Sequence, residues 1–411
     1  MSREFLVLAT VCCLATGCGP AGSEGDDGNF VQRDSAGVTI GVNPRTLART
    51  PLGWRVDSTP DLVIGNEGDG SDYLYRVQGV KGFPDGRILV VDGQSCELRF
   101  FDSEGRLLER VGRRGKGPGE FLDPVLVPWA GQDSLLLFDK GNPRFQVFTK
   151  DGQAARTLRL VAGWPAGRVP PLGAVGQHML ISRTRIVGGE TALQEDGMWR
   201  LRKEFFWFDL AEPREILLDT LTYDWAYRTN DRETPIPFAA KGAAVVTPRG
   251  ALVTDGRSAE IRSYGLNGRL RRIIRIPGSR RPVTKAMVDI VADSMAETLT
   301  WFSRGQWESE YDRVPLADSL PVFKSLLVDD LGWLWAERYG WDPRRPKEWW
   351  VFDSTGRAHG TVRTPASLEI QSIGWDFVVG IWRDDWEVEY VRRHPLRRGS
   401  REGAGGTETP E

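Results

Sequence analysis

The stretch FPDGRILVVD at residues 83–92 carries the clearest indication of the fold, because it predicts a tight turn followed directly by an apolar strand. The stretch LRFFDSEGRL at residues 98–107 continues it with a strand, a second turn and another strand. Asp-Gly and Glu-Gly turns between apolar runs are typical of antiparallel hairpins. Together the two stretches predict four short strands, a to d, with tight turns between a and b and between c and d.

The same pair of signals recurs along the chain, and such self-similarity indicates a repeat protein. Three further clear copies are residues 131–139 with 145–152, residues 248–255 with 261–268, and residues 330–337 with 350–356. Two weaker copies cover residues 175–221 and 368–393. Six four-stranded antiparallel units predict an all-β fold, a six-bladed β-propeller.

An early strand at residues 54–64 precedes the first complete unit. We expect it to complete the last blade, at residues 368–393, so that the two ends of the propeller pair with each other. Closure of this kind removes the exposed edges that an open sheet would carry.

The blade pattern, together with VGRRGKGPGEF at residues 111–121, resembles the NHL-like six-bladed β-propeller lipoproteins of environmental bacteria. The likeness runs over residues 31–394, nearly the whole of the predicted mature chain. The resemblance implies the fold and a lipid-anchored protein, and it implies no particular activity.

The first residues have the organisation of a secretory signal. Arg3 precedes an apolar run at residues 5–14, which is too short to span a bilayer, and the small residues ATG end at Cys18. This end resembles the bacterial lipobox, which predicts that Cys18 is the lipidated residue. An ordinary signal peptide with a chance cysteine remains the alternative, since Ala15 stands where leucine is commonest. Gly19 in place of the aspartate of inner-membrane lipoproteins favours the outer membrane.

Four segments follow from these signals. Residues 1–17 are predicted to be the signal peptide, residues 18–30 a flexible tether rich in Gly and acids, residues 31–396 the propeller, and residues 397–411 a disordered tail. Cys96 is the one cysteine beyond Cys18, so we expect no intramolecular disulfide.

One segment breaks the blade pattern between blades 4 and 5. Residues 284–299 place apolar side chains at helical spacing behind Thr284, a plausible cap, and predict an amphipathic helix. We interpret it as a lid packed on the propeller, and a partner-binding stripe is the alternative. The stripe consists of Met287, Val288, Val291, Met295 and Leu299.

Composition narrows the function. The charges of the 56 acidic and 54 basic residues nearly cancel, so the chain has no net positive charge that would attract nucleic acid. The three histidines, His178, His359 and His394, are far apart, and no GxSxG elbow is present. We therefore predict no catalytic residue, metal or cofactor. The alternative is a divalent-metal-dependent hydrolase or lactonase of propeller fold, and a structural envelope protein is a third hypothesis.

Two further features of the sequence each have a structural and a functional interpretation. In four copies, strand b ends in an acidic residue: Asp92, Asp139, Asp255 and Glu337. We predict that each carboxylate accepts backbone hydrogen bonds in the turn that follows. The alternative is that some of these carboxylates surround a cation in the channel. The glycine-rich residues 112–119 predict an interblade connection with positive φ, or else an anion site with Arg113, Arg114 and Lys116.

Six of the tryptophans fall into two groups by their position in the sequence. Trp207, Trp333, Trp335 and Trp350 lie on predicted strands, where we expect them to pack between blades. Trp341 and Trp349 flank the polar loop DPRRPKE, where a large ring has less reason to be buried.

The distribution of long connections points to one face. The a-to-b and c-to-d turns are minimal, whereas the long insertions, at residues 112–119, 183–200, 222–237, 277–319 and 340–348, are all d-to-a or b-to-c connections. We therefore predict a binding module with a protein, peptide or glycan ligand at the channel mouth on this face. The candidate residues are Arg113, Arg114, Lys116, Trp341, Arg344 and Arg345.

Overall fold

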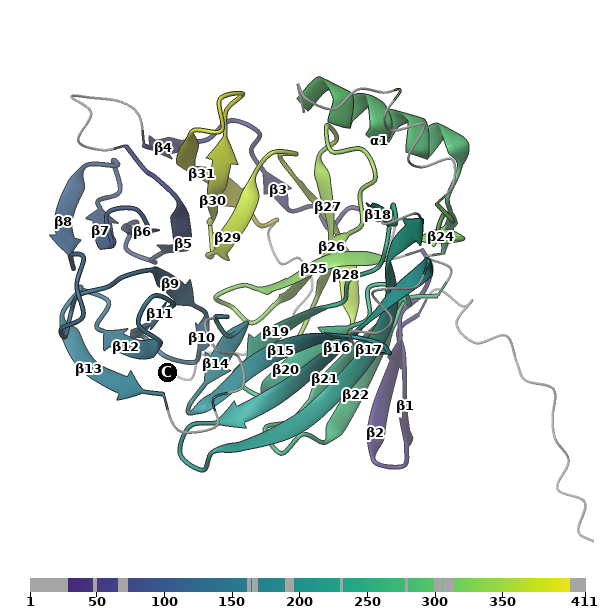
Figure 1. Cartoon of the computed structure of the whole chain (residues 1–411), viewed down its shortest axis with the longest axis horizontal. Helices are drawn as coiled ribbons and strands as arrows, with labels where there is room; N and C mark the ends of the chain where they lie inside the picture. Colours follow the sequence, from purple (N-terminus) through teal and green to yellow (C-terminus); the bar gives the residue numbers. More distant parts are fainter. Residues whose placement is uncertain are drawn as a thin grey trace, which may run out of the picture.

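The computed structural model describes residues 29–399 apart from 47–49, 66–72, 161–163, 165–168, 189–195, 230–231, 278–279, 299–304 and 306–313. The predicted signal peptide, Cys18 and nearly all of the predicted tether therefore lie outside the described residues. In the described part, six blade sheets of mainly antiparallel strands stand around a common axis (Figure 1), and a seventh sheet has two strands.

The first three blades follow the predicted strand order. Blade 1 consists of β5 (Val77–Gly82), β6 (Ile88–Asp92), β7 (Glu97–Phe101) and β8 (Leu107–Val111). Blade 2 consists of β9 (Pro124–Val127), β11 (Leu135–Asp139), β12 (Arg144–Phe148) and β13 (Ala154–Arg159). Blade 3 consists of β14 (Gly173–Val175), β15 (His178–Ile186), β16 (Gly197–Asp209) and β17 (Arg214–Thr229), with β10 (Trp129–Ala130) and β18 (Arg232–Pro235) at its edges.

The last three blades complete the ring. Blade 4 consists of β19 (Ala243–Thr247), β20 (Gly250–Thr254), β21 (Glu260–Tyr264) and β22 (Leu270–Arg275). Blade 5 consists of β25 (Phe323–Val328), β26 (Leu334–Arg338), β27 (Lys347–Phe352) and β28 (Ala358–Thr364). Blade 6 consists of β29 (Glu369–Ile373), β30 (Phe377–Arg383) and β31 (Glu389–Arg397), and its fourth position is filled by β3 (Arg55–Val56) and β4 (Leu62–Ile64).

The predicted ring closure is confirmed. The register pairs Ile64 with Val391 and Leu62 with Arg393, and Val56 pairs with Leu396. The N-terminal chain is therefore the outer strand of the C-terminal blade, and strands that would otherwise be sheet edges are joined.

The sequence analysis missed an N-terminal hairpin, β1 (Val31–Ser35) and β2 (Val38–Val42). It extends blade 4 outward, because β2 pairs in parallel with β22 (Figure 1). The chain then reaches blade 5, where the buried Asn43 side chain accepts a hydrogen bond from the Ala358 backbone amide at 2.7 Å and donates one to the Gly356 carbonyl at 3.0 Å. The first residues thus run along the outer edges of blades 4, 5 and 6.

Hydrophobic clusters fill the gaps between neighbouring blades. Leu89 and Phe100 of blade 1 pack with Leu137 and Phe148 of blade 2, and all four are almost completely buried. The same arrangement recurs around the ring. Apolar residues on both faces of each sheet explain why the strands read as nearly continuous apolar runs.

The tryptophan predictions are confirmed with one exception. Trp207, Trp335 and Trp350 are buried, and Trp333 packs against the cluster between blades 5 and 6. Trp349 was expected to be more exposed and is only 2% exposed. It lies within β27 rather than in the loop, and its indole donates a hydrogen bond to Thr364 Oγ1 at 3.0 Å.

Three boundaries also differ from prediction. Most of the described residues in 183–200 and 222–237 are strand, since β15, β16 and β17 extend beyond the blade as a long ribbon. The predicted tail begins inside the structured part, because β31 runs to Arg397 and the Arg398 side chain is only 5% exposed. His394 is 2% exposed within β31.

The predicted helix is confirmed as α1 (Lys285–Thr298), between blades 4 and 5. Thr284 accepts amide hydrogen bonds from Met287 and Val288 at its carbonyl, as the residue before a helix does. The side chains of Met287, Val288 and Val291 are partly buried. Those of Met295 and Leu299 lie outside the described part. β23 (Arg281–Pro282) and β24 (Ser319–Leu320) pair at the base of this insertion.

Candidate ligand site at the propeller mouth

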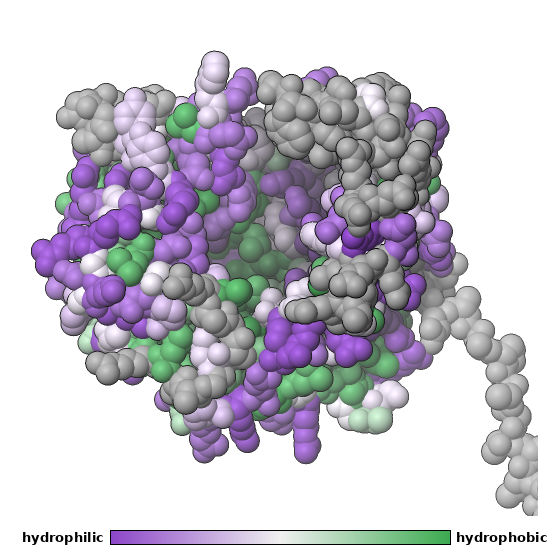
Figure 2. All heavy atoms as spheres, in the orientation of Figure 1, coloured by the Kyte–Doolittle hydropathy of each residue, from purple (hydrophilic) through white to green (hydrophobic). Residues whose placement is uncertain are grey.

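The b-to-c and d-to-a connections define one face of the ring, which we call the mouth. Four strand ends of blade 5 meet there: the start of β25, the end of β26, the start of β27 and the end of β28. Figure 2 shows one face of the ring hollowed near its middle, where the inner strands of Figure 1 surround the axis.

A cavity of about 510 Å³ lies at these strand ends, and we call it the mouth pocket. Its charged side chains come from the four strands of blade 5, from the b-to-c loop and from β23. The cations are Arg281, Lys324, Arg338, Arg345, Lys347 and Arg363, and the carboxylates are Glu337, Asp342 and Glu348. Tyr339 and Trp341 are its aromatic residues.

Each of the three carboxylates is already paired within the protein. Glu348 binds Arg338 at 2.7 Å, and Glu337 lies 3.3 Å from Lys324. Asp342 pairs with Arg345 at 3.3 Å. The excess of positive charge in the pocket is therefore not neutralised from within it.

Two of the cations are bound by carbonyl oxygens instead. The Arg281 guanidinium donates hydrogen bonds to the carbonyls of Tyr339 and Pro321, at 2.5 and 3.3 Å. Lys347 Nζ donates one to the Leu368 carbonyl at 2.6 Å. Burial lowers the pKa of Arg281 to about 10, with repulsion from Arg338 acting in the same direction. Burial also lowers the pKa of Lys347.

The three candidates from the 340–348 loop are brought together. Trp341 is partly buried, and the Arg345 guanidinium lies over its ring, 5.7 Å from the centroid. Arg344 bonds to Asp342 at 3.1 Å but does not line the pocket. The charges of Asp293 and Glu297 on α1 contribute, after Asp342, to raising the pKa of Arg344. The helix therefore lies close to this loop.

The candidates of the glycine-rich loop lie elsewhere, between blades 1 and 2. Arg113 binds Glu120 at 2.8 Å, and the Arg114 guanidinium donates to the Gln94 carbonyl at 3.2 Å. The Lys116 side chain is exposed, while its carbonyl accepts a hydrogen bond from Arg144. None of the three lines the mouth pocket.

The same loop holds a carboxylate of its own. Glu120 accepts the Gly117 amide at 2.8 Å, and this bond and Arg113 lower its pKa. Gly112 and Gly119 have φ of +94° and +73°, as the interpretation as an interblade connection requires.

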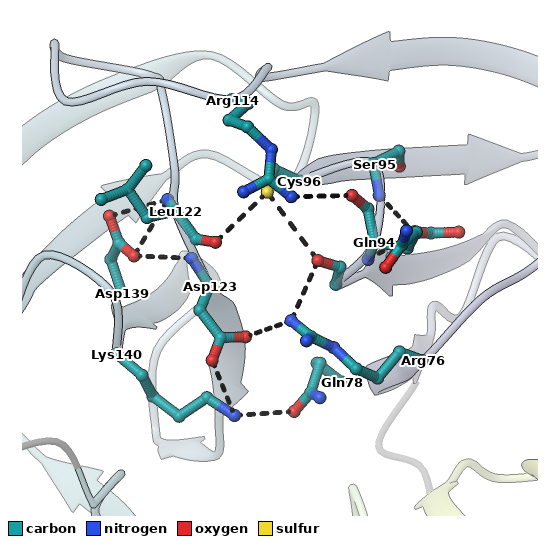
Figure 3. A network of polar contacts seen from close by, with 12 residues as sticks. Arg76, Gln78, Gln94, Ser95, Cys96, Arg114, Leu122, Asp123, Asp139 and Lys140 are labelled. Atoms are coloured by element: carbon teal, nitrogen blue, oxygen red, sulfur yellow. Dashed lines mark hydrogen bonds and ion pairs between the residues drawn. The ribbon is translucent and has the colours of Figure 1, made fainter.

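The sequence analysis missed a polar network beside this loop (Figure 3). The Arg76 guanidinium binds Asp123 at 2.7 Å, and Asp123 lies 3.4 Å from Lys140, which donates to Gln78. Arg76 has a φ of +56°, a conformation that few residues other than glycine adopt. Cys96, a buried thiol, contacts the Gly93 and Leu122 carbonyls above this network. No local pattern in the sequence marks these residues, since they come from four different connections and from β5.

The repeated acids have the predicted structural role in three of the four copies. Asp92 accepts the amides of Gln94 and Ser95, and Asp255 those of Arg257 and Ser258. Asp139 accepts the amides of Leu122, Asp123 and Asn142.

Glu337 is the exception, because its longer side chain points elsewhere. It accepts a hydrogen bond from Ser325 Oγ at 2.6 Å and pairs with Lys324, both on β25. Among the residues that the structure describes, no three His, Cys, Asp or Glu side chains are grouped as a metal site would need. In the same part of the chain, no helix is both long and apolar enough to cross a membrane.

Comparison with known proteins supports the fold. A family model described as "6-bladed beta-propeller" matches residues 73–125, which span blade 1 and the start of blade 2. The chain is a six-bladed β-propeller. No curated protein matches the sequence.

Solved structures give distant likenesses. A protein of Bacteroides fragilis described as exported is 10% identical, with 88% of this chain and 100% of that chain covered and a TM-score of 0.42. A Bacteroides vulgatus protein is 10% identical, with 85% and 100% covered and a TM-score of 0.46. At TM-scores below 0.5, these likenesses say nothing about function.

Proposed function

We propose that this chain is an envelope-anchored binding module of the NHL-like lipoprotein type, which holds a protein, peptide or glycan ligand at its mouth. The mouth pocket is the observation that carries the proposal. Its volume of about 510 Å³ falls within the range of sites that take small ligands or the end group of a larger one. Its position, on loops above a rigid ring, is where binding residues concentrate.

The lengths of the connections favour the mouth over the opposite face as the place of the ligand. Turns on the opposite face are minimal, such as Asp102 to Arg106, which is closed by hydrogen bonds of its own backbone. The mouth carries α1 and the long ribbon of blade 3, which enlarge the surface around the pocket.

Changing Trp341 and Arg345 together to alanine is expected to reduce capture of envelope partners by at least about tenfold, since buried aromatic and arginine contacts dominate binding. Both side chains line the pocket and contact each other. The measurement is quantitative capture from envelope extracts on the immobilised protein.

The matched control changes Glu104 and Lys150, two exposed residues in turns of the opposite face. Their replacement by alanine is expected to leave capture unchanged. Equal loss from both pairs, or loss from the control pair alone, would place the ligand away from the mouth.

The anchor is proposed on Cys18, in the outer membrane. A Cys18→Ala variant is expected to lose nearly all of its membrane association, because the thioether-linked lipid is the only attachment proposed. Fractionation and detergent partitioning of the variant against the unchanged chain measure this. A variant that still partitions with the envelope would refute the lipoprotein assignment.

The alternative, a metal-dependent hydrolase or lactonase, has no specific observation in its favour in the described part of the chain. Metal analysis of the purified protein tests it directly.

A further inference from the structure

The mouth pocket combines partial burial with positive charge that no carboxylate pairs: Arg281 and Lys347 are both partly buried. A buried ion is costly unless a partner of opposite charge offsets its loss of hydration. Arg338, Lys324 and Arg345 have such partners, at 2.7, 3.3 and 3.3 Å. In the part of the chain that the structure describes, Arg281 and Lys347 have carbonyl acceptors and no carboxylate within ion-pair distance.

Neighbouring charges add to this difference between the paired cations and the two without a carboxylate, Arg281 and Lys347. Arg338 repels Arg281, and Lys324 repels Lys347, while burial is the largest cause of the lowered pKa of both. Glu348 acts in the opposite direction on Arg281, and Glu337 and Glu369 do so on Lys347, but each of these carboxylates is bound to another cation. A negatively charged group in the pocket would be attracted by both cations. This attraction would be stronger than in water, because the pocket is partly desolvated.

We propose that the mouth pocket binds an oxyanion, the carboxylate or phosphate group of the ligand, through Arg281 and Lys347. This inference rests on the proposed function and adds the chemical class of the ligand to it. The glycine-rich loop is a poorer anion site, because its Gly117 amide and Arg113 are already bound to Glu120.

Geometry favours a small or terminal group over an extended polyanion. The pocket is about 510 Å³, and Trp341 with the overlying Arg345 forms one of its walls. Arginine and lysine both donate to oxyanions, and an aromatic wall suits a sugar ring or a flat side chain beside the charged group.

The test is calorimetric titration of the purified protein with inorganic phosphate and, separately, with glucuronate, using glucose as the uncharged control. Binding of either anion, with no binding of glucose, is expected, and the affinity should fall as salt rises. Changing Arg281 and Lys347 together to glutamine should weaken that binding at least tenfold. Which anion binds identifies the source of the oxyanion.

The matched control removes two cations of the same face that lie outside the pocket, Lys285 and Arg257, whose side chains are 91% and 64% exposed. Their change to glutamine should alter affinity less than twofold. Thermal unfolding checks that each variant folds, and Lys347→Gln alone replaces the double variant if that one does not.

Three results would overturn the inference: no anion binds, glucose binds equally well, or the Arg281 and Lys347 variant binds as the unchanged protein does. The same variant in the capture assay separates the two proposals. Full capture by this variant, with capture lost on changing Trp341 and Arg345, contradicts the oxyanion site and leaves the binding module intact. Unchanged capture by both variants contradicts the proposed function itself.

Discussion

An Ile64→Asp variant is expected to lose about 5 kcal/mol or more of its free energy of unfolding, enough to leave much of the protein unfolded or aggregated. Ile64 is 3% exposed and packs with Val391 and Leu74 in the cluster that joins blades 6 and 1. Aspartate there removes a large apolar contact and buries a charge without a partner. It also loosens the strand that closes the ring, which would expose a sheet edge.

The neighbouring residue is the control. Val63 lies on the same strand and is 41% exposed, so Val63→Asp should change the free energy of unfolding by less than about 1 kcal/mol. Urea unfolding followed by tryptophan fluorescence compares the two midpoints. Similar midpoints for the two variants would mean that β4 does not close the ring.

An Arg398→Ala variant is expected to lose about 3–5 kcal/mol, because removing one partner of a buried ion pair leaves the other charge uncompensated. Arg398 lies 2.8 Å from Asp329, and the two side chains are 5% and 0% exposed. The guanidinium also stacks over Trp54, 4.2 Å from the ring centroid, and donates to the carbonyls of Gly374 and Trp375. This one residue therefore joins blades 5 and 6 to the N-terminal chain.

Arg397 supplies the comparison, since it is adjacent, 76% exposed and paired with Asp57 on the surface. Its change to alanine should cost no more than about 1 kcal/mol. The thermal unfolding temperatures of the two variants measure the difference. A loss at Arg397 as large as that at Arg398 would contradict the role of the buried pair.

The fold was predictable where the signals are local. Turns such as Pro84-Asp85-Gly86 stand between apolar runs, and Gly86 has the positive φ that such a turn needs. Six repetitions then fix the ring, and the strand predicted at residues 54–64, which forms as the two short strands β3 and β4, pairs with the last blade.

The parts that were missed depend on contacts distant in sequence. The parallel pairing of β2 with β22 joins residues more than 200 positions apart, and nothing near residues 31–42 indicates it. Trp349 was misjudged because the strand β27 begins two residues earlier, at Lys347, inside the expected loop. Glu337 follows the repeat in position but not in contact, because one more methylene lets it reach Ser325.

The site shows the same division. Counting long connections identifies the mouth, since insertions are visible in a sequence. It selects Trp341 and Arg345, which line the pocket, together with four residues that do not, Arg113, Arg114, Lys116 and Arg344. Arg281 and Lys347 could not be selected in this way. What distinguishes them from the other basic residues of the pocket is their partial burial together with the carbonyl partners that tertiary packing gives them.

Ligand binding at the mouth is tested most directly by site-specific photo-crosslinking in the producing cells. The photoreactive residue p-benzoylphenylalanine replaces Trp341 in one variant and Glu104, on the opposite face, in the other. A crosslinked species that forms on illumination from position 341, and not from position 104, is the expected result. No crosslink from position 341, or equal crosslinking from the two positions, would contradict a ligand at the mouth.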